Sequence, residues 1–259
     1  MKLVVLGSGS SIPHPKRSSS GYWLETTGGT LLLDCSASVA SRMAANALDW
    51  PNLDAIWISH FHLDHCGGLA PFLAGTKHSA VMKQRTKPLK IFGPPGIKNL
   101  ISGFSDVNNY RLLEQPFPVE VIEIEEQNKF EILQNVEAVA LKTPHTDESH
   151  AIHIRDADDT TLVYSADTGF SEVIGAFANR VDLFILECTF IRDKPIQKHL
   201  ELAEAIYLIR KAKPKCAMLT HFYPEWDDVD FAVELRKFEP NCEVIEAVDG
   251  LRLELRNEK

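Results

Sequence analysis

Four strong metal ligands lie within six consecutive residues of the chain: His60, His62, Asp64 and His65. An apolar run over residues 54–58 precedes them and predicts a buried strand, and two glycines and a predicted helix follow them. Histidines two residues apart project to one side of an extended backbone. Imidazole together with carboxylate suits zinc, with iron and manganese as competitors. The spacing therefore predicts a metal site in a strand-to-helix turn, rather than a run of exposed polar residues.

Other acidic residues and histidines follow predicted strands elsewhere in the chain. These strands cover residues 30–33, 136–141, 161–164 and 217–219, and the polar residues that follow them are Asp34, His145, Asp167 and His221. Helices are expected over residues 39–48, 69–84, 97–104, 171–179, 200–211 and 229–238. The alternation of strands and helices favours an α/β fold. We therefore expect these side chains and the histidine motif to meet at one edge of a packed sheet.

Composition limits the partners and the compartment. With 259 residues and 44% hydrophobic content, the chain is expected to form one domain over residues 1–259. Its formal charge of −9 opposes a general attraction to nucleic acid. Five widely spaced cysteines without a C-x-x-C pair indicate a reducing cytoplasm rather than a disulfide framework. The apolar start is too short for a signal peptide and no run reaches membrane-spanning length, so we expect no membrane association.

The histidine motif and the polar residues after the strands resemble the five motifs of the metallo-β-lactamase superfamily, across most of the chain. The resemblance implies a four-layer αββα sandwich that binds two metal ions. The implied ligands of the first ion are His60, His62 and His145, and those of the second are Asp64, His65 and His221. Asp167 is implied to bridge both ions, and Asp34 is implied to orient a ligand histidine from outside the ligand shell.

Within that superfamily, the ribonuclease Z branch gives a closer match. Residues 13–18 resemble its P-x-K-x-R-N loop, with Ser18 in place of Asn. Residues 187–190, followed by His199, resemble its final block. The resemblance implies that His199 lies over the active centre and assists phosphodiester cleavage. Glu187 and Thr189 are candidates to orient His199, and ordinary strand packing is the alternative interpretation.

The chain also departs from the ribonuclease Z pattern. Lys16 and Arg17 are candidates to hold a substrate phosphate, with a solvated turn as the alternative. After the last ligand, however, residues 223–226 replace the Ser-x-Arg-Tyr of that branch. The branch carries a basic tRNA-gripping arm between its third and fourth motifs, whereas residues 146–166 here mostly form a predicted hairpin with an acidic turn. We therefore expect tRNA to be an unlikely partner.

The leading hypothesis is a hydrolase with two Zn²⁺ ions per chain, or Mn²⁺ or Fe²⁺ in their place. It acts as a phosphodiesterase on a small phosphodiester or nucleotide-type substrate, using a hydroxide that bridges the metals. Asp64 accepts the proton of the water and His199 donates one to the substrate. The alternatives are a tRNA 3′-processing endoribonuclease, a lactone, ester or thioester hydrolase, and a metal-binding interaction module without turnover. The resemblance also leaves a homodimer open, because the relatives are often dimers.

Overall fold

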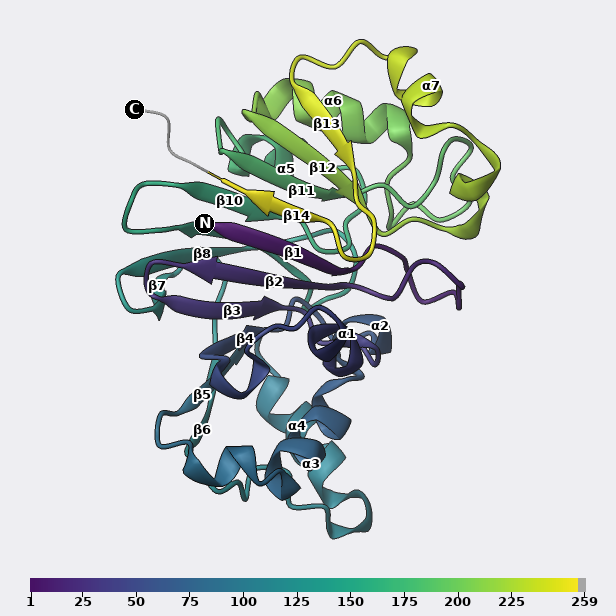
Figure 1. Ribbon diagram of the computed structural model, residues 1–259. Coiled ribbons are helices and arrows are strands. Elements are labelled where there is room, and N and C mark those ends of the chain that lie inside the picture. Colours follow the sequence, from purple (N-terminus) through teal and green to yellow (C-terminus); the bar gives the residue numbers. More distant parts are fainter. Residues whose placement is uncertain (256–259) are drawn as a thin grey trace.

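Two seven-stranded sheets form the centre of the computed structural model, which describes residues 1–255. The first sheet has the order β14-β1-β2-β3-β4-β5-β6 (Figure 1). Its strands are β1 (Lys2–Gly7), β2 (Gly21–Thr26), β3 (Gly29–Leu33), β4 (Ala55–Trp57), β5 (Leu89–Gly93), β6 (Val119–Glu123) and β14 (Arg252–Glu254). Neighbouring strands are antiparallel from β14 to β3 and parallel from β3 to β6. The first and last strands of the chain therefore lie side by side.

The second sheet has the order β13-β12-β11-β10-β9-β8-β7. Its strands are β7 (Lys129–Leu133), β8 (Val136–Lys142), β9 (His150–Arg155), β10 (Thr161–Tyr164), β11 (Leu183–Glu187), β12 (Cys216–Thr220) and β13 (Glu243–Glu246). Neighbours are antiparallel from β7 to β10 and parallel from β10 to β13. Consequently β8, β10 and β12 run in one direction and end at the same edge of this sheet.

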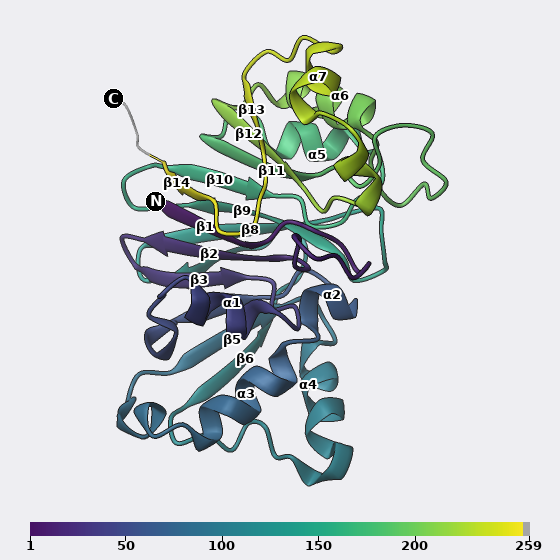
Figure 2. The same ribbon diagram turned by 45° about the vertical axis from the view of Figure 1, so that its right-hand side comes forward.

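Helices cover the outer faces of both sheets (Figures 1 and 2). The helices are α1 (Val39–Ala45), α2 (Leu63–Cys66), α3 (Leu69–His78), α4 (Ile97–Asp106), α5 (Glu172–Phe177), α6 (Leu202–Ala212) and α7 (Phe231–Arg236). Along β1, Leu3 and Val5 belong to the core shared with the second sheet, whereas Val4 and Leu6 pack with α1, α3 and α4. Successive side chains of a strand point to opposite faces, so a strand buried on both faces contributes alternate residues to two cores. The arrangement confirms the αββα sandwich that the resemblance implied.

The structure differs from the sequence-based expectation in two elements. Strand β7 was not predicted; Phe130 on it stacks on Trp57 of the first sheet, with 6.0 Å between ring centroids. The helix expected over residues 69–84 ends at His78, and a separate 3-10 helix covers Val81–Gln84. The break lies at Ser79, whose backbone is extended, with a ψ of 129°. After the 3-10 helix, the guanidinium of Arg85 donates to four backbone carbonyls, those of Pro51, Leu53, Lys87 and Pro88.

The sequence led us to expect free cysteines and no membrane-spanning segment. All five cysteines are free thiols. Burial raises the pKa of the Cys66 thiol to about 12, and the charge of Asp34 adds to that rise, so Cys66 stays protonated at neutral pH. Within residues 1–255, none of the helices combines the length and the apolar character needed to cross a membrane.

The long loop between β1 and β2 is held by a residue from the far end of the chain. The backbone and hydroxyl of Ser8 both donate to Asp249 Oδ1 at 2.9 Å, and the backbone of Ser18 donates to Asp249 Oδ2 at 2.8 Å. The Ser8 carbonyl in turn accepts from the backbone of Phe222, the residue after His221, at 3.1 Å. The loop thereby connects the C-terminal segment to a predicted ligand.

We expect Asp249→Ala to lower the free energy of unfolding by about 2–4 kcal/mol, because it leaves three donors of a nearly buried site without an acceptor. Urea denaturation of the purified variant measures this change. Glu120→Ala removes an exposed carboxylate from β6 and serves as the control, with an expected change within about 0.5 kcal/mol. Equal midpoints for the two variants would show that Asp249 does not anchor the loop.

Candidate metal centre

All seven predicted ligands converge where the two sheets meet. His60 and His62 follow β4, and Asp64 and His65 lie on the short helix α2. The ligands from the second sheet are His145 after β8, Asp167 after β10 and His221 after β12. They form two overlapping groups of donors that share Asp167. The site is therefore built from the strand ends of both sheets, and not from one edge of a single sheet as expected.

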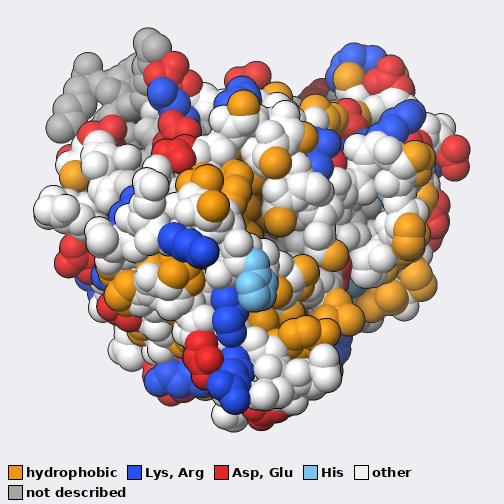
Figure 3. All heavy atoms as spheres, turned by 60° about the horizontal axis from the view of Figure 1, so that its bottom comes forward, with side chains coloured by type: hydrophobic (Ala, Val, Ile, Leu, Met, Phe, Trp, Pro, Cys, Tyr) orange, Lys and Arg blue, Asp and Glu red, His pale blue; other side chains and the backbone are white. Residues whose placement is uncertain are grey.

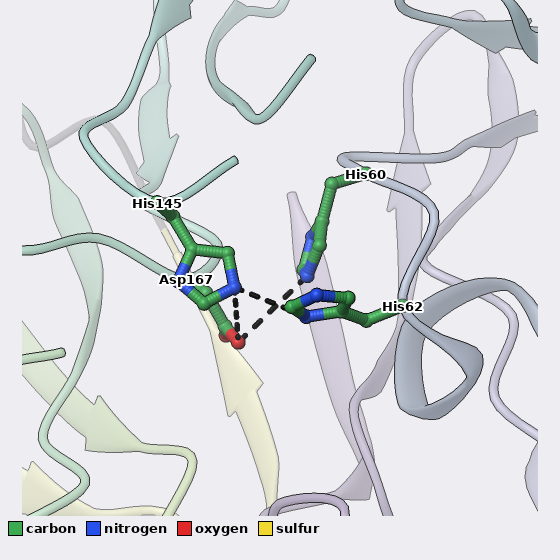
Figure 4. Close-up of side chains that lie close together, drawn as sticks. All are labelled: His60, His62, His145 and Asp167. Atoms are coloured by element: carbon green, nitrogen blue, oxygen red, sulfur yellow. Dashed lines mark hydrogen bonds and ion pairs between the residues drawn. The ribbon is translucent and has the colours of Figure 1, made fainter. Parts of the chain in front are cut away.

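The first group consists of three imidazoles around one oxygen of Asp167. His145 Nε2 lies 3.6 Å from Asp167 Oδ2, and His60 Nε2 lies 3.8 Å from the same oxygen. His62 approaches with its other ring nitrogen, since its Nδ1 lies 3.1 Å from His145 Nε2. Figure 4 shows these side chains pointing toward a common centre. Such a group offers three nitrogens and one carboxylate oxygen.

The second group faces the other oxygen of Asp167. His65 Nε2 and His221 Nε2 lie 3.2 Å and 3.3 Å from Asp167 Oδ1. Asp64 Oδ2 completes the group, at 3.7 Å from His65 Nε2 and 3.4 Å from His221 Nε2. Because Oδ2 serves the first group and Oδ1 the second, the carboxylate of Asp167 has the geometry of a bridge.

The chemistry of these donors fits divalent metal ions. His60 Nε2, His65 Nε2 and Asp167 Oδ1 are buried and have no hydrogen-bond partner. Unsatisfied buried polar atoms are costly, and three of them here point into the same space. Ligands at ~2.0–2.2 Å from a tetrahedral ion lie about 3.3–3.5 Å from one another. The separations of 3.1–3.8 Å in both groups agree with that spacing.

A buried carboxylate, Asp34, orients two of the imidazoles. Its Oδ2 accepts from His65 Nδ1 at 2.7 Å, from the Tyr164 hydroxyl at 2.7 Å and from the Ser59 hydroxyl at 2.9 Å. The Ser59 oxygen accepts in turn from His60 Nδ1 at 3.0 Å. Each ring is therefore held by a hydrogen bond at Nδ1 and turns Nε2 toward the metal space. Asp34 takes the orienting position that the resemblance implied.

Two other ligands have their outer nitrogens held in a similar way. His145 Nδ1 donates to the carbonyl of Lys198 at 2.9 Å, and His221 Nδ1 donates to the hydroxyl of Thr189 at 2.9 Å. Lys198 precedes His199, so the loop that carries His199 also anchors His145. The sequence analysis named Thr189 as a candidate to orient His199, but it missed the contact of Thr189 with His221 and the role of the Lys198 carbonyl.

The charges within the cluster strongly affect one another. Burial raises the pKa of Asp167, but the neighbouring His221 and His65 outweigh burial and hold the pKa well below its usual range. Burial lowers the pKa of His60, and the adjacent His65 lowers it further. Burial also lowers the pKa of His65, yet Asp167 and Asp34 overcome this and raise it. An ionised Asp167 beside a neutral His60 is the protonation state that metal ligands require.

His199 lies against the cluster and pairs with Glu187. Its ring centroid is 4.8 Å from that of His145 and 5.3 Å from that of His221. His199 Nδ1 donates to Glu187 Oε1 at 2.9 Å. Burial lowers the pKa of His199, but the hydrogen bond and charge of Glu187 raise it to about 9. His199 can therefore carry a proton at neutral pH next to the metal space.

Glu187, His199 and His221 also lie close enough together to resemble a third metal site. The carboxylate of Glu187, however, already accepts from five donors. These donors are the backbone of Thr168, Thr189 and Leu200, the Thr189 hydroxyl and His199 Nδ1. A carboxylate with both oxygens occupied in this way is an orienting group and not a ligand.

The structure gives Lys16 and Arg17 different surroundings. The side chain of Arg17 is 9% exposed, with its guanidinium over the Phe222 ring and donating to the Ala247 carbonyl and to Glu246 Oε1. Lys16 is exposed, and its Nζ lies 3.6 Å from Asp227. Arg17 is thus engaged in fixing the loop, unlike the free phosphate ligand expected from the sequence. Binding of a substrate phosphate by either residue stays a prediction.

An open depression of about 610 Å³ borders the second donor group. The described residues that line it are Ser11, Ser19, Ala37, His62, Leu63 and Asp64. Lysine and arginine are absent from this lining, and Leu63 is 68% exposed at its edge. The depression offers hydroxyl and apolar surface directly beside two candidate ligands, which suits an uncharged part of a substrate.

The fold and the donor groups define a metal-dependent hydrolase of the metallo-β-lactamase fold. The family described as "Anti-Pycsar protein Apyc1" matches residues 1–239 through its family model. The chain belongs to this family.

Individual relatives agree with this class. The ribonuclease Z of Clostridium perfringens is 25% identical over 88% of this chain and 90% of that protein. The probable metallo-hydrolase YhfI of Bacillus subtilis is also 25% identical, over 85% of this chain and 86% of that protein. The crystal structure of YhfI matches with a TM-score of 0.79 at 24% identity and covers 97% of this chain and 98% of that chain. The short form of human tRNase Z matches with a TM-score of 0.78 at 21% identity and covers 99% of this chain and 100% of that chain.

Proposed function

We propose that this protein is a dinuclear zinc-dependent phosphodiesterase that acts on small phosphodiester or nucleotide-type substrates. One observation carries the proposal: the two oxygens of Asp167 face two separate donor groups, and a protonated His199 lies against both. The shared carboxylate supports two ions rather than one, and His199 supports chemistry in which a leaving oxygen needs a proton.

The residues divide the work of hydrolysis between them. Two bound divalent ions would lower the pKa of a water molecule and neutralise charge that develops on the phosphate. Asp64, at the edge of the depression, accepts the proton of the attacking water. His199, held by Glu187, donates its proton to the leaving oxygen. Asp34 and Ser59 keep two imidazoles in position, so the site needs little reorganisation during the reaction.

Several features support a small substrate. The depression beside Asp64 is lined without lysine or arginine, so it favours an uncharged group over a string of phosphates. On the face shown in Figure 3, basic side chains are interspersed with acidic and hydrophobic ones. The turn between β9 and β10 exposes Asp158 and Asp159 in the interval where a basic arm would protrude, whereas Asp156 is buried and accepts from Thr27. Polyanion binding needs many cationic contacts, which these surfaces do not offer.

Processing of tRNA 3′ ends is the second candidate. It is favoured by the names of relatives, since ribonuclease Z and tRNase Z match over most of this chain. Hydrolysis of lactones, esters or thioesters by the same metal pair is a third candidate, and the presence of His199 together with the early loop that carries Lys16 and Arg17, as in the ribonuclease Z branch, favours the phosphodiesterase over it. A panel of a small diester, a phosphomonoester, a lactone and a precursor tRNA separates these candidates.

We expect about two Zn²⁺ ions per chain after loading and removal of excess metal, measured by elemental analysis. Asp167→Ala should sharply lower this number, because it removes one donor from each group. Asp147→Ala removes an exposed carboxylate outside both groups and should leave the metal content unchanged. A ratio that stays at one ion per chain in saturating zinc would contradict the dinuclear proposal.

His199→Ala should reduce kcat on a small phosphodiester by about 10²-fold or more, the usual effect of losing a positioned acid. Its metal content should stay near that of the unmodified protein, because His199 belongs to neither of the two ligand groups proposed here. His78→Ala, at an exposed histidine on α3, is the matched control. A wild-type kcat for His199→Ala would remove His199 from the proposed mechanism.

We expect measurable hydrolysis of a small chromogenic diester and weak, salt-sensitive binding of precursor tRNA at physiological ionic strength. The physical reason is the scarcity of cationic surface around the depression and the acidic β9–β10 turn. Steady-state kinetics and filter binding measure the two substrates side by side. Efficient 3′ cleavage together with submicromolar tRNA binding would make tRNA processing the better assignment.

A further inference from the structure

We propose that Thr189 is a positioning residue that connects a metal ligand, His221, to the carboxylate that holds the proton donor, His199. The inference rests on the proposed function for the roles of the two histidines. Thr189 lies two residues beyond Glu187, and alternate residues of an extended segment face the same side. Its hydroxyl is therefore delivered to the same buried space as the carboxylate of Glu187, where both residues are almost completely shielded from solvent.

The directions of the hydrogen bonds follow from the chemistry of the groups. An ionised carboxylate can only accept, so the single proton of the Thr189 hydroxyl goes to Glu187 Oε2, at 2.8 Å. The hydroxyl oxygen is then left as an acceptor for His221 Nδ1, at 2.9 Å. His221 must carry its proton on Nδ1, which leaves Nε2 bare and facing Asp64 and Asp167. Thr189 thus selects the only neutral tautomer of His221 that can bind metal through Nε2.

Glu187 joins this pair to His199. Its other oxygen, Oε1, accepts from His199 Nδ1 at 2.9 Å. The backbone amides of Thr168 and Leu200 donate to the two oxygens and fix the carboxylate plane. One carboxylate therefore holds one imidazole directly and a second imidazole through a hydroxyl.

The opposite side of the site repeats this arrangement. Asp34 accepts directly from His65, and it holds His60 through the hydroxyl of Ser59. On that side both imidazoles are candidate ligands. On the Glu187 side one imidazole is a ligand and the other is the proton donor. Two separate segments of the chain thus form the same hydrogen-bonded chain of carboxylate, hydroxyl and imidazole. In this comparison Thr189 corresponds to Ser59.

The hydroxyl has no substitute nearby in the described structure. Thr189 is fully buried, and its hydroxyl is the acceptor that lies against His221 Nδ1. His221 has a positive φ of 61°, an uncommon backbone conformation for this residue type. Without the hydroxyl, His221 Nδ1 either stays unpaired or gives up its proton to Nε2, and the second tautomer cannot bind metal through Nε2. The Thr189 carbonyl separately accepts from Trp226 Nε1 at 3.2 Å, a contact that a side-chain substitution leaves in place.

The test compares Thr189→Val, Thr189→Ala and Thr189→Ser in zinc titrations against a chromogenic chelator. Removal of the hydroxyl in the Val and Ala variants should weaken one of the two zinc equivalents by about 10- to 100-fold and leave the other near its original affinity. Thr189→Ser keeps the hydroxyl and should restore affinity to within a few-fold. The Val and Ala side chains differ in volume, so if one of these two variants does not fold, the other still tests the proposal.

Thr160→Val is the matched control, because Thr160 is equally buried but lies at the β9–β10 turn and contacts none of the candidate ligands. It should bind both zinc equivalents as the unmodified protein does. Ser59→Ala should weaken the equivalent to which His60 contributes, and the Ser59→Ala, Thr189→Val double variant should weaken both. Wild-type affinity for both equivalents in Thr189→Val or in Thr189→Ala would overturn the proposal, as would a loss that Thr189→Ser does not restore.

Metal titration separates this inference from the proposed activity. A protein that hydrolyses no phosphodiester, but loses one zinc equivalent on Thr189→Val, would contradict the proposed function and support the role of Thr189. If the protein hydrolyses the diester and Thr189→Val binds zinc as the unmodified protein does, the proposed function is supported and the role of Thr189 is contradicted.

Discussion

A single buried carboxylate ties the two sheets together at the site. Asp34 follows β3 of the first sheet and accepts from Ser59 and His65 on that side, and from Tyr164, the last residue of β10, on the other. A buried charge is costly unless its lone pairs are satisfied. The four hydrogen bonds to Asp34 meet that requirement only when both sheets are in place. The packing of the two sheets and the orientation of the ligand histidines therefore depend on each other.

The strand ends at the site adopt unusual backbone conformations. Asp34, Ala166 and His221 have φ values of 58°, 51° and 61°, in the left-handed region that residues with a side chain seldom adopt. Each lies at the point where a strand ends and a candidate ligand or orienting group must turn inward. Such strain persists only where surrounding contacts determine the conformation. The hydrogen bonds to Asp34 and from His221 to Thr189 supply those contacts.

The ligands could be predicted from the sequence because they depend on local order: each candidate follows a short apolar strand. The resemblance also pointed to Asp34 and Glu187 as orienting groups, but most of their hydrogen-bond partners could not be predicted, because those partners are remote in the chain. Tyr164 and Asp34 are 130 residues apart, and Ser8 and Asp249 are 241 residues apart.

The contacts that fix the loop between β1 and β2 also bear on the size of the substrate that the site can attract. The conformation of the loop depends on carboxylates from the C-terminal part of the chain: Asp249 holds its backbone, Glu246 pairs with Arg17, and Asp227 lies within 4 Å of both Lys16 and Arg17. The carboxylates that fix the loop also neutralise its cations. A loop stabilised in this way can border an active site without attracting a long polyanion, and the screening of surface charges at physiological salt weakens what attraction is left. Under the proposed function, recognition then depends on the metal centre and on the short-range fit of the group beside Asp64, and neither requires more than one phosphodiester.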